Sequence, residues 1–170
     1  VEHRRCVTPI ITYCNNLCYE GVLAPKKTQG PKVAIPPMFG VHVQGTALKS
    51  SSGSRYNEKE ALAIAAWLYT NQAMLCDKHH SALGSIVGIV TPFKAQIGAI
   101  ESALKSRGIT GLTIGTVHAL QGAEREVVIF SPVCTHNDAE GRLFFNTSPN
   151  MLNVAVSRAK ENFIIIGDMG

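Results

Sequence analysis

Residues 116–124, TVHALQGAE, combine several groups that suit phosphate and sugar binding. Gly122 lets the backbone approach a ligand closely, and its N–H can bind a phosphate oxygen. Glu124 can accept hydrogen bonds from ribose hydroxyls. Thr116 and His118 carry a hydroxyl and an imidazole, which commonly contact a nucleic-acid backbone. By themselves these residues also fit a plain turn in which the glycine serves only the backbone geometry.

Arginines near both ends of the chain are further candidates for phosphate contacts. Arg158 is expected on a helix just before the last strand, where an arginine finger can stabilise charge on a transferring phosphoryl group. Arg4 and Arg5 form a basic pair near the start, and a guanidinium fork suits a terminal phosphate. Taken singly, each of these arginines also fits a solvated surface position, which is the more common place for an arginine.

The usual machinery for holding ATP is missing from the sequence. There is no GxxxxGK[ST] phosphate loop, and no apolar strand ends in the Asp-Glu pair that holds magnesium. This chain therefore cannot cradle the phosphates of ATP and its metal in the usual way. The candidate residues are instead suited to completing such a site from outside.

Short apolar runs alternate with amphipathic segments along the chain. Strands are expected at 41–43, 86–90, 112–117, 127–131 and 163–166. Helices are expected at 8–19, from Asn57, from Thr91-Pro92 to Gly108, and from Ser148-Pro149. This alternation predicts an α/β fold with a mostly parallel sheet and helices on both faces.

Two details of this pattern bear on the site. Asn57 is expected to cap its helix, with Glu60 as the partner in a capping box. Ligands of parallel sheets gather at the carboxyl ends of the strands. The polar residues that follow strands are therefore expected at one edge: Thr91-Pro92, 116–124 and Gly167-Asp168.

Composition places the chain among ordinary globular domains. Its 170 residues are 45% hydrophobic and 16% charged, which excludes disorder and predicts one domain over residues 1–170. The apolar runs are too short to span a membrane. The net charge of +4 is compatible with a phosphate-rich partner without requiring one. Five cysteines without a CxxC pair indicate reduced thiols and an intracellular location, cytoplasm or nucleus, and predict no metal site.

Taken together, the sequences of these segments and their order along the chain resemble the conserved motifs of superfamily 1 helicases. The branch with the closest likeness contains the nonsense-mediated-decay helicase and the flap-processing helicase-nuclease. Residues 116–124 resemble motif V of that family, and residues 153–168 resemble motif VI and its following strand. The remaining likeness lies in 88–93 with Gln96, in Asn57 with Glu60-Ala61, in 2–6 with 9–11, and in 19–21.

The resemblance implies a RecA-like three-layer sandwich: the second motor domain of a larger helicase, with the P-loop NTPase fold but no P-loop. ATP and Mg²⁺ would be held mainly by a first RecA-like domain of the same protein. Arg5 and Arg158 would then contact the γ-phosphate, and Gly122 and Glu124 would touch phosphate and sugar. The family usually has an aromatic residue, which stacks on adenine, where this chain has Arg4, whose guanidinium plane can also stack on a base.

The same resemblance implies a track for single-stranded nucleic acid, with DNA expected over RNA and movement from 5′ to 3′. The residues implied to line the track are Thr91, Pro92, Thr116, His118 and Gln121. The chain alone is expected to be inactive as an ATPase. An alternative stays open, in which a helicase-derived module binds nucleic acid or a protein and hydrolyses nothing.

Overall fold

The computed structural model describes residues 2–7, 10, 24–27, 35–120, 123–136, 138–140 and 149–168, and it places the side chains of all of these except 2–7, 24–27 and 149. Its centre is a five-stranded sheet in which every neighbouring pair is parallel. The strand order is β3 (Met38–His42), β9 (Ala159–Gly167), β8 (Arg125–Phe130), β6 (Val87–Val90) and β7 (Thr113–Gly115). The predicted α/β class with a parallel sheet is confirmed.

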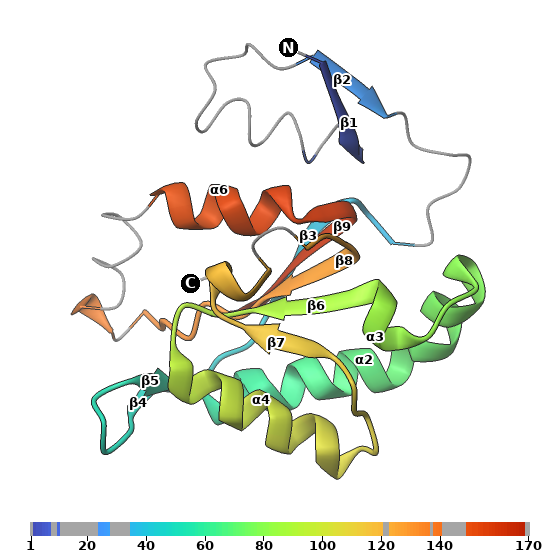
Figure 1. Ribbon diagram of the computed structural model, residues 1–170. Helices are drawn as coiled ribbons and strands as arrows, with labels where there is room; N and C mark the ends of the chain where they lie inside the picture. Colours follow the sequence, from blue (N-terminus) through green and yellow to red (C-terminus); the bar gives the residue numbers. More distant parts are fainter. Residues whose placement is uncertain are drawn as a thin grey trace.

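Helices cover both faces of this sheet (Figure 1). On one face lie α2 (Glu58–His79) and α4 (Lys94–Ser106), and their apolar sides pack on a core that includes Ile64, Leu68 and Ile100. On the other face lie α6 (Pro149–Ser157) and the 3-10 helix η1 (Val117–Leu120). They pack on a second core that includes Phe130 and Phe163. β6 and the later residues of β8 and β9 are apolar on both faces because both faces are buried there.

Smaller elements flank the sheet. A short α3 (Leu83–Ile86) leads into β6, and β4 (Leu48–Lys49) pairs antiparallel with β5 (Arg55–Tyr56) in a hairpin. A separate pair, β1 (Glu2–Val7) and β2 (Ala24–Lys27), is parallel. Of the helix predicted over 8–19 only Ile10 lies within the described residues, and it is buried in the core on the α6 side. None of the helices among the described residues combines the length and apolar character needed to cross a bilayer.

Of the two hydrogen bonds predicted for a capping box at the start of α2, one is present and one is not. Asn57 is the N-cap, and its side-chain oxygen accepts a hydrogen bond from the Glu60 N–H at 3.2 Å, as expected. The Glu60 carboxylate does not return to the Asn57 N–H. That N–H instead donates to Oε1 of Gln96 at 2.8 Å. The prediction of a reciprocal capping box is therefore wrong, because the Glu60 side chain points into the protein, as described below.

The start of α4 also differs. Thr91 and Pro92 were expected to begin this helix, but it begins at Lys94 after Phe93, which provides no side-chain cap. A neighbouring element supplies the missing acceptor: Oγ of Ser54, in the β4–β5 hairpin, accepts from the Ala95 N–H at 3.1 Å. Thr91 and Pro92 therefore form a turn between β6 and α4.

Candidate functional site

The predicted site residues lie at two opposite edges of the sheet. Because the five strands are parallel, their carboxyl ends share one edge and their amino ends share the other. Thr91 and Thr116 follow the carboxyl ends of β6 and β7. Glu124 and Arg158 precede the amino ends of β8 and β9.

This separation corrects the expectation that all of residues 116–124 lie at the carboxyl edge. The segment leaves β7 at that edge, forms η1 across one face of the sheet, and reaches the opposite edge where β8 begins. Val117 and Leu120 of η1 are buried against the sheet, which holds this crossing in place. Gln121 and Gly122 lie outside the described residues. One short segment therefore connects the two edges.

At the carboxyl edge, the turn after β6 is joined to the end of β7. The Thr91 N–H donates to the Gly115 carbonyl at 3.0 Å. The Thr91 side chain, implied to line a nucleic-acid strand, is fully buried, and its hydroxyl accepts from the Phe93 N–H at 3.4 Å. Pro92 and Thr116 are partly exposed and His118 is exposed. Thr91 therefore shapes the turn, while the other three present surface to a ligand.

At the amino edge, Arg158 lies in the turn between α6 and β9, one residue beyond the helix on which it was expected. Its N–H donates to the Ala155 carbonyl at 3.1 Å, and its carbonyl accepts from the Arg125 N–H at 3.0 Å. Its Nε is buried and has no hydrogen-bond partner among the described residues. Arg158 as a residue is partly exposed, and its backbone is held from both sides, so a guanidinium placed here suits a phosphate oxygen.

Arg4 and Arg5 belong to β1, and this strand contacts β9. Ile10, just beyond β1, packs in the core on the same face as α6. The backbone therefore brings the start of the chain to the strand that Arg158 precedes. The side chains of Arg4 and Arg5 are outside the described part of the structure.

A residue that the sequence did not single out fixes the position of Glu124. Nη1 of Arg125 donates to the Glu124 carbonyl at 3.0 Å, and Nη2 donates to Oγ1 of Thr113 on β7 at 3.2 Å. Because β6 lies between β8 and β7, the Arg125 side chain crosses over β6. It crosses at Gly88, where an added Cβ would lie 3.1 Å from Cγ of Arg125. The only sequence signal was the glycine inside an apolar strand.

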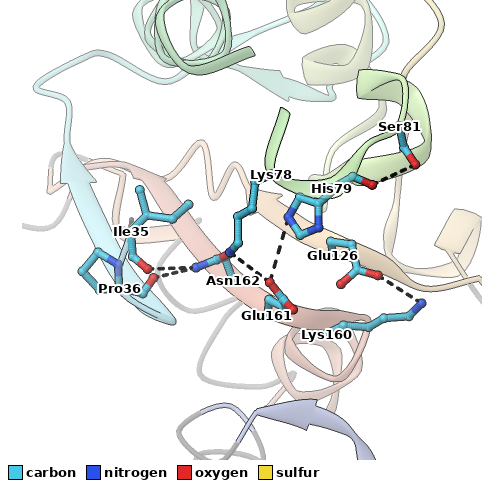
Figure 2. A network of polar contacts seen from close by, with 9 residues as sticks. All are labelled: Ile35, Pro36, Lys78, His79, Ser81, Glu126, Lys160, Glu161 and Asn162. Atoms are coloured by element: carbon cyan, nitrogen blue, oxygen red, sulfur yellow. Dashed lines mark hydrogen bonds and ion pairs between the residues drawn. The ribbon is translucent and has the colours of Figure 1, made fainter. Parts of the chain in front are cut away.

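A polar network at the amino edge joins the end of α2 to β8 and β9 (Figure 2). Nζ of Lys78 lies 3.0 Å from Oε2 of Glu161, and Nε2 of His79 lies 3.9 Å from the same atom. Nζ of Lys160 lies 3.4 Å from Oε1 of Glu126. His79, Glu126 and Glu161 offer ligand atoms that all lie within 4.8 Å of one another. Since a lysine ammonium already neutralises each carboxylate, we interpret the group as an ion-pair network that holds these elements together.

A second network lies at the carboxyl edge and is buried. Oε1 of Glu60 accepts from the hydroxyl of Ser131, which follows β8, and from the Val133 N–H at 2.9 Å. Nε2 of Gln96 donates to Oγ of Ser131 at 3.0 Å and to the Asn57 carbonyl at 3.2 Å. Glu60, Gln96 and Ser131 all have 0% exposure. The network therefore joins α2, α4 and the end of β8 without contact with solvent.

Burial dominates the ionisation of Glu60. It raises the pKa of the carboxyl to about 8, the hydrogen bonds from Ser131 and Val133 lower it in part, and the charge of Asp168 raises it. An apolar environment disfavours the charged form of an acid. A sequence signal was available, because Glu60 lies four residues before Ile64 and so shares the buried face of α2.

Comparisons with known proteins agree with this arrangement. The sequence model described as an AAA domain matches residues 2–170. The chain is 30% identical over 183 residues to the human protein "3'-5' exoribonuclease HELZ2", which covers 96% of the chain and 6% of that protein. It is 31% identical over 144 residues to "Regulator of nonsense transcripts 1" of Dictyostelium discoideum, covering 78% of the chain and 10% of that protein. It is 38% identical over 82 residues to "DNA polymerase alpha-associated DNA helicase A" of Schizosaccharomyces pombe, covering 48% and 12%.

A solved structure has the same fold. The C-terminal domain of a possible DNA helicase from Lactobacillus plantarum WCFS1 matches with a TM-score of 0.56 at 15% identity, covering 98% of this chain and 88% of that one. The chain spans only a small part of the curated relatives above, from 6% to 12% of their length. The chain belongs to the AAA domain family, among the superfamily 1 helicases of the branch expected from its motifs, and has the RecA-like fold of a helicase C-terminal domain.

Proposed function

We propose that this chain is the second RecA-like motor domain of an ATP-dependent nucleic-acid helicase. The observation that carries the proposal is the placement of Arg158, whose backbone is hydrogen-bonded to α6 and to the start of β8 while the residue itself stays partly exposed. Arg158 and Arg5 contact the γ-phosphate of a nucleotide held by a first RecA-like domain of the same protein. Glu124 and Gly122 contact the sugar and a phosphate, and Arg4 stacks on the base.

ATP, bound with Mg²⁺ mainly by the first domain, supplies the phosphoanhydride bond whose cleavage drives the cycle. The role of this chain is to present hydrogen-bond donors to the nucleotide between the two domains and to bind single-stranded nucleic acid at another surface. Pro92, Thr116 and His118 form the grip at the carboxyl edge, and the buried Thr91 shapes the turn beside them. Gln121 is a further contact of the strand in this proposal.

The route of residues 116–124 supports a link between these two activities. Thr116 lies at the carboxyl edge and Glu124 at the amino edge, and the buried residues of η1 connect them across one face. A shift of the nucleotide side on cleft closure is therefore transmitted through a short packed segment to the strand side. Packed elements transmit such shifts because protein interiors are close to incompressible.

The direct test is Arg158→Ala in the full-length protein, assayed for strand-stimulated ATP hydrolysis. Loss of an arginine finger costs on the order of a thousandfold or more in rate. Arg107→Ala is the matched control, because Arg107 lies at the end of α4 and stacks on Tyr69 at 5.5 Å. Full hydrolysis by Arg158→Ala, with folding intact, would refute the assignment.

The preferred polymer, DNA or RNA, and the direction of movement need a test of their own. One relative is named a DNA helicase, one an exoribonuclease and one a regulator of nonsense transcripts, so the names point to both polymers. We propose single-stranded DNA as the preferred strand and movement from 5′ to 3′. Tailed duplexes of DNA and of RNA, each with a 5′ or a 3′ overhang, test both points in one unwinding assay.

A further inference from the structure

Glu60 is a carboxyl group with no exposed surface, and the proposed function gives it no role. Its two oxygens have different environments. Oε1 accepts from the Ser131 hydroxyl and from the Val133 N–H, whereas Oε2 is buried with no hydrogen-bond partner among the described residues. An isolated buried charge is costly, so a carboxyl in this position is favoured in its neutral form. Because both donors point at Oε1, the acid proton belongs on Oε2.

The hydrogen bonds that start at Glu60 lead to the turn after β6. Ser131 donates to Glu60 and accepts from Nε2 of Gln96 at 3.0 Å, so its hydroxyl has a fixed direction. The Gln96 N–H donates to the Phe93 carbonyl at 3.1 Å. The Ser131 N–H also donates to the Val90 carbonyl, directly before Thr91, at 2.9 Å. The turn over 91–93 is therefore held at both ends by backbone N–H groups of Gln96 and Ser131, the two residues whose side chains connect to Glu60.

The backbone near Glu60 is also constrained. Val133, whose N–H donates to Glu60, has a φ of 67°, a left-handed conformation that is costly for a β-branched residue. At Gly167, an added Cβ would lie 3.1 Å from Oε2 of Glu60 and 2.5 Å from Cγ of Pro132. The ends of β8 and β9 thus close tightly around this one carboxyl group.

We propose that Glu60 is a positioning residue for the nucleic-acid grip: through Ser131 and Gln96 it sets the 91–93 turn against the ends of β8 and β9. The proposal rests on the proposed function, because it assigns the turn to strand binding. Glu60 itself does not touch the strand. It acts by keeping Pro92 in place beside Thr116.

The proton on Glu60 gives this role a signature that a merely structural residue would lack. With a pKa raised to about 8, the carboxyl is neutral at pH 7 and charged at pH 9. The charged form would face Asp168 at the end of β9, with the Cys134 thiol, Arg55 and Asp138 further along the loop after β8 and the adjoining hairpin. His42 and His136 lie against Asp168, and Gln96 from α4 is neutral. Ionisation of Glu60 therefore adds a second negative charge beside Asp168 in a buried site. The hydrogen bonds from Ser131 and Val133 stabilise that charge only in part, so the ends of β8 and β9 that enclose the carboxylate are favoured to open.

The test measures the affinity of the full-length protein for a fluorescent single-stranded DNA oligonucleotide between pH 6.5 and 9. The wild type is expected to bind several-fold more weakly at pH 9 than at pH 7. Glu60→Gln keeps the acceptor at Oε1 and mimics the neutral acid, so it is expected to match the wild type at pH 7 and to lack the Glu60-dependent loss at pH 9. Glu58→Gln is the control, because Glu58 is exposed on the same helix turn and should keep the wild-type pH profile.

Glu60→Ala provides the complementary arm. It leaves the Ser131 hydroxyl and the Val133 N–H without an acceptor, and affinity at pH 7 should fall by on the order of tenfold, with rescue in Glu60→Gln. If Glu60→Ala does not fold, the affinities of the wild type and of Glu60→Gln across the pH range still test the role of Glu60.

The outcomes separate the two proposals. Strand binding by the wild type with the same pH profile in Glu60→Gln would overturn the role of Glu60 and leave the helicase assignment standing. Absence of strand binding and of strand-stimulated hydrolysis in the wild type at every pH would overturn both.

Discussion

The main-chain N–H of Arg125 donates to the carbonyl oxygen of Arg158 at 3.0 Å, which joins the first residue of β8 to the turn before β9. The Arg125 side chain meanwhile holds the Glu124 carbonyl. One arginine to which we assign no ligand therefore positions two residues, Glu124 and Arg158, that we propose contact the nucleotide. This relationship predicts that changes at Arg125 reach the nucleotide side of the site.

Arg125→Ala removes the hydrogen bonds to the Glu124 carbonyl and to Thr113. We expect the free energy of unfolding to fall by about 1–2 kcal/mol, the scale of lost partly buried hydrogen bonds, as measured by urea denaturation. The KM for ATP of the full-length protein should rise, because Glu124 is no longer held. Arg107→Ala should change neither quantity appreciably, and an unchanged KM in Arg125→Ala would count against the positioning role.

The raised pKa of Glu60 predicts that stability falls as pH rises. An ordinary glutamate has a pKa near 4.5, and the folded protein raises that of Glu60 to about 8. Between these values the folded state binds more protons than the unfolded state, so the free energy of unfolding decreases with pH. At about 1.4 kcal/mol for each pKa unit, the total loss is on the order of a few kcal/mol.

Urea denaturation from pH 4.5 to 9 measures this dependence. Glu60→Gln should flatten the part of the curve that Glu60 contributes, whereas Glu58→Gln should leave the wild-type slope. The same slope in all three proteins would show that the Glu60 carboxyl does not take up a proton on folding.

Replacing glycine by alanine is expected to have opposite effects on stability at Gly98 and Gly167. Gly98 lies in α4 with open space around an added Cβ, so Gly98→Ala should stabilise the protein by about 0.5–1 kcal/mol through its helix propensity. At Gly167 the added Cβ would lie 2.5 Å from the Pro132 ring, which cannot move away cheaply. Gly167→Ala should therefore lower the melting temperature while Gly98→Ala raises it. Equal shifts would contradict the packing of Pro132 on β9.

The thiol of Cys134 should be unreactive in the folded protein. Burial, helped by the charge of Asp138, raises its pKa to about 12, so only about one thiol in ten thousand is ionised at pH 8. In peptide mapping after iodoacetamide treatment at pH 8, Cys134 should be labelled more slowly than the partly exposed Cys76. Urea should remove the difference. Rapid labelling of Cys134 without denaturant would show that the loop after β8 opens.

Local pattern predicted much of the fold. Continuous apolar runs marked the buried strands, Asn57 marked the start of α2, and Gly108, with a φ of 71°, lies just beyond the end of α4. The start of α4 was predicted wrongly. Thr91-Pro92 resembles a helix start, but α4 begins at Lys94 and the Ser54 hydroxyl caps it from a separate hairpin. Such a partner is invisible to a pattern read along the chain.

The sequence by itself determined the main helices and strands of the central sheet, its parallel arrangement and the motifs that identify the family, because these depend on side chains a few positions apart. It did not predict the 3-10 helix η1 or the β4–β5 hairpin. Tertiary structure alone decided that Thr116 and Glu124 lie at opposite edges of the sheet, and that Arg158 is held by Arg125. It also decided that Glu60 pairs with Ser131, 71 positions away, and not with the cap at Asn57. The physical reason is that a buried polar group must find its hydrogen bonds wherever folding places a partner, and that partner has no fixed spacing along the chain.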